Sequence, residues 1–388
     1  MTIIKYLIIV ILLIVSKNSF ATEGDNKFIS GKIKTEFFFV DNYTSNNKKN
    51  IYKDYYNRTK LSLRANITDQ LSLNSVIKSS KMKQNLENEM RDKTLTGSGT
   101  RSFENHGAYL EKLYLKYSTN NLDLFAGKKT LNFGNAWKKS QYMWILNKSL
   151  EYYQFNEKFA LGGVLKGGRE DGNGKYLLTL GSYFNDDKYS DNSRITKREY
   201  IGNNTTKSGD DKSLFASYYA ALDISYDFGN DEKLTYHFGY VKSAIADRGY
   251  DVERLEVSDQ KSYVANINYQ IPVTKNILPK IFIEYVFLDN YGGSNLKNSH
   301  LLTKYITLNL YQNYHLTYTI FKVKHFEIGT NNIDKDIDEI SLGYKFNKNN
   351  ILNGLSTRIG YNREVINKKT SNEETESAIL YLKYEYKF

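Results

Sequence analysis

The stretch that decides the fold is Ala378-Ile379-Leu380-Tyr381-Leu382-Lys383-Tyr384-Glu385-Tyr386-Lys387-Phe388. Its even-numbered positions are all apolar or aromatic, whereas its odd-numbered positions include Lys383, Glu385 and Lys387. A period of two sustained over a segment of this length is typical of a β-strand with one apolar and one polar face. The segment is therefore predicted to be a strand that separates two different environments.

The same alternation recurs through the chain after residue 27 and predicts about sixteen strands. An even number suits a barrel whose two termini lie on the same side. The clearer segments cover residues 59–67, 71–77, 113–117, 122–126, 220–226, 234–240, 265–271, 281–287, 306–310, 316–320, 340–346 and 355–361, with weaker alternation at 31–40, 159–166 and 176–184.

The connections between these segments have two lengths. Short breaks fall at residues 68–70, 119–121, 229–231, 312–314 and 347–350, and long polar breaks at 81–107, 129–157, 185–212 and 243–259. Short turns on one side and long loops on the other are typical of a transmembrane barrel, with the turns periplasmic and the loops extracellular. The fold class is therefore predicted as an all-β, antiparallel, up-and-down transmembrane β-barrel of about sixteen strands.

Charged residues test this prediction, because Lys or Arg on the lipid face at mid-depth costs roughly 2–4 kcal/mol. The charges in phase with the apolar face are expected at the loop ends of strands, with none in mid-strand. They are Glu111, Lys128, Lys242, Lys261, Lys304, Lys322, Asp338 and Glu376. A soluble β-sandwich gives no reason for such a bias.

Composition and the N-terminus narrow the class further. The 388 residues include 34 tyrosines, two prolines and no cysteine, which excludes a disulfide framework and a thiol nucleophile. The mean hydropathy of −0.57 excludes a helical multi-span membrane protein. Lys5, an apolar run at 6–15 and Ser19-Phe20-Ala21 indicate a secretory signal peptide. We therefore divide the chain into a signal peptide, residues 1–21, and a barrel, residues 22–388.

Two segments resemble Gram-negative outer-membrane porins. Phe388, preceded by Tyr386 and Tyr384, resembles the C-terminal assembly signal of that class, and AYLEKLYLKYSTNNLDLFAGKKTLNFGNAW at 108–137 is similar to a porin hairpin. No motif selects a subfamily. The resemblance implies location in the cell outer membrane, contact with its lipid and lipopolysaccharide, recognition by the barrel-assembly machinery and, as in many porins, a homotrimer.

A sixteen-stranded barrel can enclose an aqueous channel, so inward positions should set its selectivity. Basic residues dominate those positions, and rings of basic side chains favour anions. The predicted pore-lining residues are Lys60, Arg64, Lys112, Lys116, Arg358, Lys383 and the acidic Glu284. The alternative is that the lysine excess reflects biased codon usage and merely solvates the wall.

The third loop, residues 129–157, is the predicted constriction, folded into the lumen. Its candidate residues, which could hold a sugar or an anion, are Trp137, Lys138, Lys139, Trp144 and Glu151. The same aromatic residues could instead lie at a strand end in the lipid interface, where Trp and Tyr are enriched.

Other chemistry has little support in the sequence. None of the five histidines has metal-ligand spacing, and no nucleophile elbow is present. The one conceivable hydrolytic group is an acid–histidine pair formed by His106 and Glu104, with Asp92 nearby in the sequence. We therefore expect that the protein is not an enzyme and that it has no catalytic residue, no metal, no cofactor and no nucleic-acid partner.

The expected function is passive diffusion of small hydrophilic solutes with mild anion preference. The alternatives are a channel specific for carbohydrate or acidic polysaccharide, and an adhesin or hydrolase barrel without transport.

Overall fold

The computed structural model describes eleven stretches of the chain, all beyond residue 27. They are residues 28–81, 100–102, 106–136, 153–169, 174–184, 216–244, 258–274, 276–327, 332–346, 353–369 and 371–388. The predicted signal peptide lies outside the described residues, and so do all five residues of the predicted constriction set. Within the described residues, no helix is long and apolar enough to cross a membrane.

The described chain is almost entirely β-strand, with two single-turn 3₁₀ helices, η1 (Lys48–Asn50) and η2 (Tyr291–Gly293). The strands are β1 (Ile29–Ser45), β2 (Tyr52–Asn66), β3 (Leu71–Lys81), β4 (Thr100–Ser102), β5 (His106–Ser118), β6 (Leu122–Lys129), β7 (Lys158–Gly168), β8 (Lys175–Phe184), β9 (Ser217–Gly229), β10 (Glu232–Ser243), β11 (Gln260–Gln270), β12 (Ile277–Asp289), β13 (Lys297–Leu310), β14 (Tyr314–Glu327), β15 (Ile333–Lys345), β16 (Leu355–Lys368) and β17 (Ser371–Lys387).

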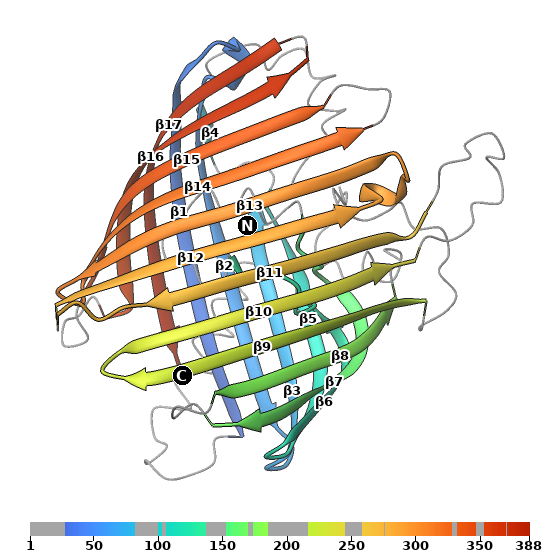
Figure 1. Ribbon diagram of the computed structural model, residues 1–388. Coiled ribbons are helices and arrows are strands. Elements are labelled where there is room, and N and C mark those ends of the chain that lie inside the picture. Colours follow the sequence, from blue (N-terminus) through green and yellow to red (C-terminus); the bar gives the residue numbers. More distant parts are fainter. Residues whose placement is uncertain are drawn as a thin grey trace.

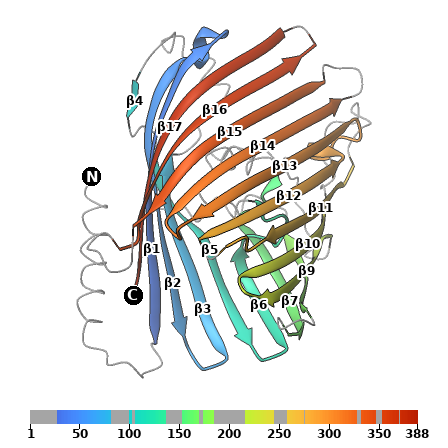
Figure 2. The same cartoon turned by 60° about the vertical axis from the view of Figure 1, so that its left-hand side comes forward.

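Sixteen of these strands close into one antiparallel up-and-down barrel (Figure 1), as the alternation predicts. The seventeenth, β4, has three residues and pairs in parallel with β2. β17 and β1 pair along their length and close the ring, as the view in Figure 2 shows. Gly31 N donates to Phe388 O at 2.9 Å, and Phe388 N donates to Gly31 O at 3.0 Å.

The two ends of the barrel differ, as predicted. On one side the connections are turns, such as those between β5 and β6 and between β9 and β10; on the other side lie the long loops after β3, β6, β8 and β10. This difference is confined to the connections from β3 to β11. The other connections on the loop side, between β1 and β2, β12 and β13, β14 and β15, and β16 and β17, are all short.

Two belts of aromatic rings border the outer face, as expected for a transmembrane barrel. On the loop side, ring centroids 4.8–6.1 Å apart link Tyr218, Tyr240, Tyr263, Phe287, His300 and Phe326 in sequence. On the turn side, Tyr344 lies between Tyr314 and Phe346. Tyr314 and Phe326, both on β14, are twelve residues apart. In a tilted strand that separation spans about 30 Å, the thickness of the hydrocarbon core.

The structure corrects three of the charges that we assigned to loop ends on the lipid face. A bulge in the β3–β5 ladder leaves Glu111 unpaired in register, and its side chain is buried against inward-facing lysines. Lys128 is also buried, paired with Glu157. Lys304 does face outward, but it lies in the middle of β13, in register with Ile283 and Ile320. The expectation of no charge in mid-strand was therefore wrong for Lys304.

Candidate functional site

The inward face of each strand follows from burial and register. On β1, Glu36, Phe38, Val40 and Asn42 are buried, whereas the intervening Phe37 is exposed. Because directly opposed residues of neighbouring strands lie on the same face of a sheet, the ladder carries this assignment around the barrel. Glu284 and Arg358 are inward by the same test, and both are buried.

A basic strip covers the inward face of β16, β17, β1, β2, β3 and β5. We define it as nine inward Lys and Arg side chains: Lys32, Lys34, Arg58, Lys60, Lys78, Lys112, Arg358, Lys383 and Lys387. Four carboxylates pair with members of the strip, namely Glu36, Glu111, Glu339 and Glu385. Nine cations against four carboxylates leave a formal excess of five positive charges.

Glu36 organises the centre of this strip. Its carboxylate accepts from Arg58 Nε at 2.6 Å, pairs with Lys34 Nζ at 2.7 Å and accepts from the Tyr381 hydroxyl at 2.5 Å. The Arg58 guanidinium lies 5.3 Å from the centre of the Phe38 ring. These contacts hold long basic side chains along the wall, so their charges keep fixed positions in the lumen.

Glu111 forms the second node of the strip. Its carboxylate lies 2.7 Å from Lys60 Nζ and 3.7 Å from Lys78 Nζ. The bulge that turns Glu111 inward therefore places a carboxylate between two lysines of neighbouring strands. The pairing reduces repulsion between Lys60 and Lys78 without removing the positive excess of the strip.

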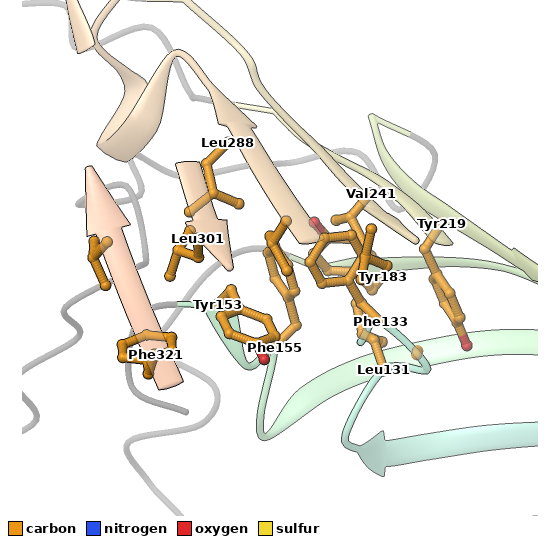
Figure 3. Packing of buried hydrophobic residues seen from close by; sticks show 14 of the residues in the cluster. Leu131, Phe133, Tyr153, Phe155, Tyr183, Tyr219, Val241, Leu288, Leu301 and Phe321 are labelled. Carbon is orange, nitrogen blue, oxygen red and sulfur yellow. The ribbon is translucent and has the colours of Figure 1, made fainter. Parts of the chain in front are cut away.

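Part of the opposite inner face is apolar. We define the apolar wall as ten buried inward residues of β8–β15: Tyr183, Tyr219, Val241, Val264, Val286, Leu288, Leu301, Phe321, Val323 and Ile337. Two segments of the third loop pack on this wall, and we call them the stems, residues 130–136 and 153–157. Leu131, Phe133, Tyr153 and Phe155 of the stems are buried in one cluster with it (Figure 3).

Polar contacts fix the stems to each other and to the barrel. Leu131 N donates to Phe155 O at 3.0 Å, which joins the two stems. Asn132 Nδ2 donates to Asp223 Oδ2 at 2.8 Å, and the other oxygen of Asp223 lies 2.7 Å from Nδ1 of the buried His237. Tyr153 donates its hydroxyl to Glu284. Burial, then the neighbouring charge of Glu284, raises the pKa of Tyr153 well above its usual value, so this donor stays protonated.

The predicted pore-lining residues all lie on the inward face, in three places. Lys60, Lys112, Arg358 and Lys383 belong to the basic strip. Arg64 and Lys116 lie nearer the turns, where Arg64 Nε donates to Asn66 Oδ1 and Lys116 pairs with Asp123. Glu284 lies on β12, fully buried beneath the stems. Their part in solute passage stays a prediction.

Several residues named in the sequence predictions lie outside the residues that the structure describes. Trp137, Lys138, Lys139, Trp144 and Glu151 lie outside the described residues, as do Glu104, Asp92 and the side chain of His106. The stems were not predicted in detail. One signal was present: the third loop begins with Leu131 and Phe133 and ends with Tyr153 and Phe155, which is strand-like alternation within a segment read as loop.

Comparison with known proteins bears on the fold. No family model matches the sequence, and no curated protein matches it. The outer membrane channel DcaP of Acinetobacter baumannii is 12% identical, with a TM-score of 0.53 over 92% of this chain and 96% of that one. A loop L8 deletion mutant of OmpT, an outer membrane protein of Vibrio cholerae, is 11% identical, with a TM-score of 0.52 over 92% and 98%. OccAB3 of Acinetobacter baumannii is 9% identical, with a TM-score of 0.50 over 93% and 99%.

The match extends over nearly the whole of each barrel. A structure of OmpT in a trimer form also matches, at 11% identity and a TM-score of 0.50. Together with the closed sixteen-strand ring and its two aromatic belts, these similarities define the class: the protein is a closed antiparallel β-barrel with the fold of the Gram-negative outer-membrane porins. The predicted fold is thereby confirmed.

Proposed function

We propose that the protein forms an aqueous channel for passive diffusion of small hydrophilic solutes, with a mild preference for anions. The observation that carries this proposal is the basic strip, with its formal excess of five positive charges on one side of the lumen. Basic side chains lining a pore lower the electrostatic cost of an entering anion and raise that of a cation.

The arrangement of the inner face supports a route along the strip. The stems pack against the apolar wall, so their described residues cover apolar surface rather than the basic side chains. A solute crossing the lumen would therefore meet Lys34, Arg58 and Lys60. Because their carboxylate partners hold these side chains at the wall, the strip would act by its field and not by enclosing one solute tightly.

We propose a transport role without catalysis. Within the described residues, no group of three or more His, Asp or Glu side chains is arranged to hold a metal ion. The closest acid–histidine contact among the described residues joins Asp223 and His237. Asp223 also accepts a hydrogen bond from the stem residue Asn132. A structural role in anchoring the stem accounts for that contact.

The deciding experiment is the reversal potential of the purified protein in a planar bilayer under a KCl gradient. We expect a potential that favours chloride, because the strip is positive. Clear cation selectivity would contradict the anion preference. A folded barrel that inserts but gives no conductance would favour an adhesin-like role. Liposome swelling with neutral sugars, phosphate and dicarboxylates would then separate a general pore from a solute-specific channel.

Assembly partners form a second part of the proposal. Tyr384 and Tyr386 face outward at the turn-side end of β17, and we propose that they serve with Phe388 as the signal read by the barrel-assembly machinery. A homotrimer is supported by the trimer form of the structurally similar OmpT. Light scattering of the detergent-purified protein would test the trimer, and a monomer mass would contradict it.

A further inference from the structure

We propose that Glu284 is a positioning residue that clasps both stems against the apolar wall. One buried carboxylate on β12 would then decide how much of the lumen the stems occupy. The position of the stems does not depend on any transport role. Only the expected effect on conductance rests on the proposed function.

The carboxylate of Glu284 accepts four hydrogen bonds. Backbone N–H groups of Asn135 and Ala136 donate to its two oxygens at 2.8 and 3.2 Å. The Tyr153 hydroxyl donates to Oε1 at 2.6 Å, and Asn266 Nδ2, on the neighbouring strand β11, donates to Oε2 at 2.8 Å. Asn266 also donates to the side chain of Asn135 at 2.9 Å. Three of the four donors thus come from the stems.

The donors come from both stems, which is what makes the carboxylate a clasp. Asn135 and Ala136 end the first stem, and Tyr153 begins the second, seventeen positions after Ala136. Both stems therefore meet at one side chain. Ala136 is fully buried and packs with Phe282 and Tyr305 on the inner face of β12 and β13.

Glu284 also differs from the other buried carboxylates of the described chain. Glu36, Glu111, Asp123, Glu157 and Glu339 are each paired with a Lys or Arg. Glu284 has no such ion pair in the described residues, and neutral donors satisfy it. A buried carboxylate without a cation is costly unless its oxygens are hydrogen-bonded. The stems and the carboxylate therefore depend on each other.

The side chain of Glu284 is not needed to build the barrel. β12 is held by backbone ladders with β11 and β13, in which Glu284 is opposite Asn266 and Thr303. Changing the side chain leaves those ladders intact. We therefore expect Glu284 variants to fold as barrels and to differ in where the stems lie.

Glu284→Gln is the most informative variant. Glutamine keeps the size of the side chain, but its amide nitrogen replaces one carboxylate oxygen and can only donate hydrogen bonds. An N–H or O–H group of the stems or of Asn266 would then lose its acceptor and face a second donor. Tyr153→Phe is the milder variant, because it removes one donor and leaves the charge. Glu364→Gln is the matched control: it removes an inward carboxylate of β16 that, unlike Glu284, pairs with a lysine, Lys335, at 2.5 Å.

The test uses the absence of cysteine from the chain. Ala136→Cys introduces a single thiol at the clasp, and its rate of reaction with a charged thiol reagent reports exposure of the first stem. We expect slow labelling when Glu284 is retained, both in the otherwise unsubstituted protein and in the Glu364→Gln variant. Labelling should be faster in the Glu284→Gln variant. The Tyr153→Phe rate should lie between them. Equal rates in all four backgrounds, in barrels that circular dichroism shows to be folded, would overturn the proposal.

Single-channel recording separates the clasp from the proposed function. If the protein conducts, Glu284→Gln should raise the conductance or abolish its single steady level, and Glu364→Gln should do neither. Faster labelling without any conductance from the unsubstituted protein would support the clasp and contradict the channel. If Glu284→Gln does not fold, Tyr153→Phe decides: unchanged labelling in that variant overturns the clasp.

Discussion

The two parts of the inner face, the basic strip and the apolar wall, are built on the same strand geometry but carry opposite chemistry. The strip places Lys and Arg side chains in the lumen with carboxylates between them. The apolar wall places Val241, Leu301 and Phe321 inward and buries them under the stems. The difference teaches that the inward apolar residues of β8–β15 lie where the stems, and not water, fill the lumen. The following four predictions test this contrast.

The largest effect is expected from Phe133→Ala in the first stem. Phe133 is fully buried and meets the Phe155 ring at 5.2 Å between centroids. Loss of a buried phenyl ring costs about 3–5 kcal/mol of the free energy of unfolding. Chemical denaturation of the detergent-solubilised barrel would measure it. Phe159→Ala, on the lipid-facing side of β7, is the control and should lose less. Equal losses would mean that the stems contribute no special packing.

The next effect is on ion selectivity. Lys34, Lys60 and Lys78 changed together to Gln would lower the formal excess of the strip from five charges to two. We expect the reversal potential to shift toward that of a non-selective pore. The matched control changes Lys53, Lys261 and Lys304, which face outward, to Gln. Equal shifts in the two triple variants would show that the strip has no particular role.

A smaller change in the opposite direction should follow from Glu111→Gln. This substitution removes the carboxylate between Lys60 and Lys78 and raises the excess from five to six. The anion preference should increase in the reversal-potential measurement. Loss of a charged hydrogen-bond partner should also lower the free energy of unfolding by roughly 1–3 kcal/mol. A decrease in anion preference would contradict the assigned role of Glu111.

The smallest effect is that of salt on the unsubstituted protein. Raising KCl from 0.1 to 1 M shortens the Debye length from about 10 Å to about 3 Å. A preference produced by the field of the strip should therefore weaken when the same concentration ratio is applied at higher salt. A preference that does not change with salt would point to selection by size or by direct binding.

Much of the fold could be predicted because alternation and loop length are local properties of the sequence. Prediction was weakest at 159–184, and packing explains why. Gly162 on β7 lies opposite Gly181 on β8. A Cβ on Gly162 would lie 2.8 Å from the Phe125 ring, and one on Gly181 would lie 2.6 Å from the Tyr219 ring. Small inward residues make room for large ones on neighbouring strands, so neither β7 nor β8 shows its period clearly.

The candidate site could be predicted only in part. The alternation of inward and outward positions along each strand was enough to place Lys60, Arg358 and Lys383 on the inward face. It could not show that Glu284 is covered, because the covering residues come from a loop distant in sequence. The same alternation gave the wrong face for Glu111, because a bulge at this residue turns its side chain inward. Contacts between distant segments and irregular ladders leave no periodic trace.

Closure by β1 and β17 has a kinetic consequence. Glu36 and Tyr381, which bond across this junction, are 345 positions apart, whereas the β9–β10 hairpin pairs residues from 3 to 24 positions apart. For a loop of that length, the entropy cost exceeds that of a twenty-residue loop by about 2–3 kcal/mol. The hairpins should therefore form first and the ring should close last. Until it closes, β1 and β17 each carry an unpaired edge that can bind another chain.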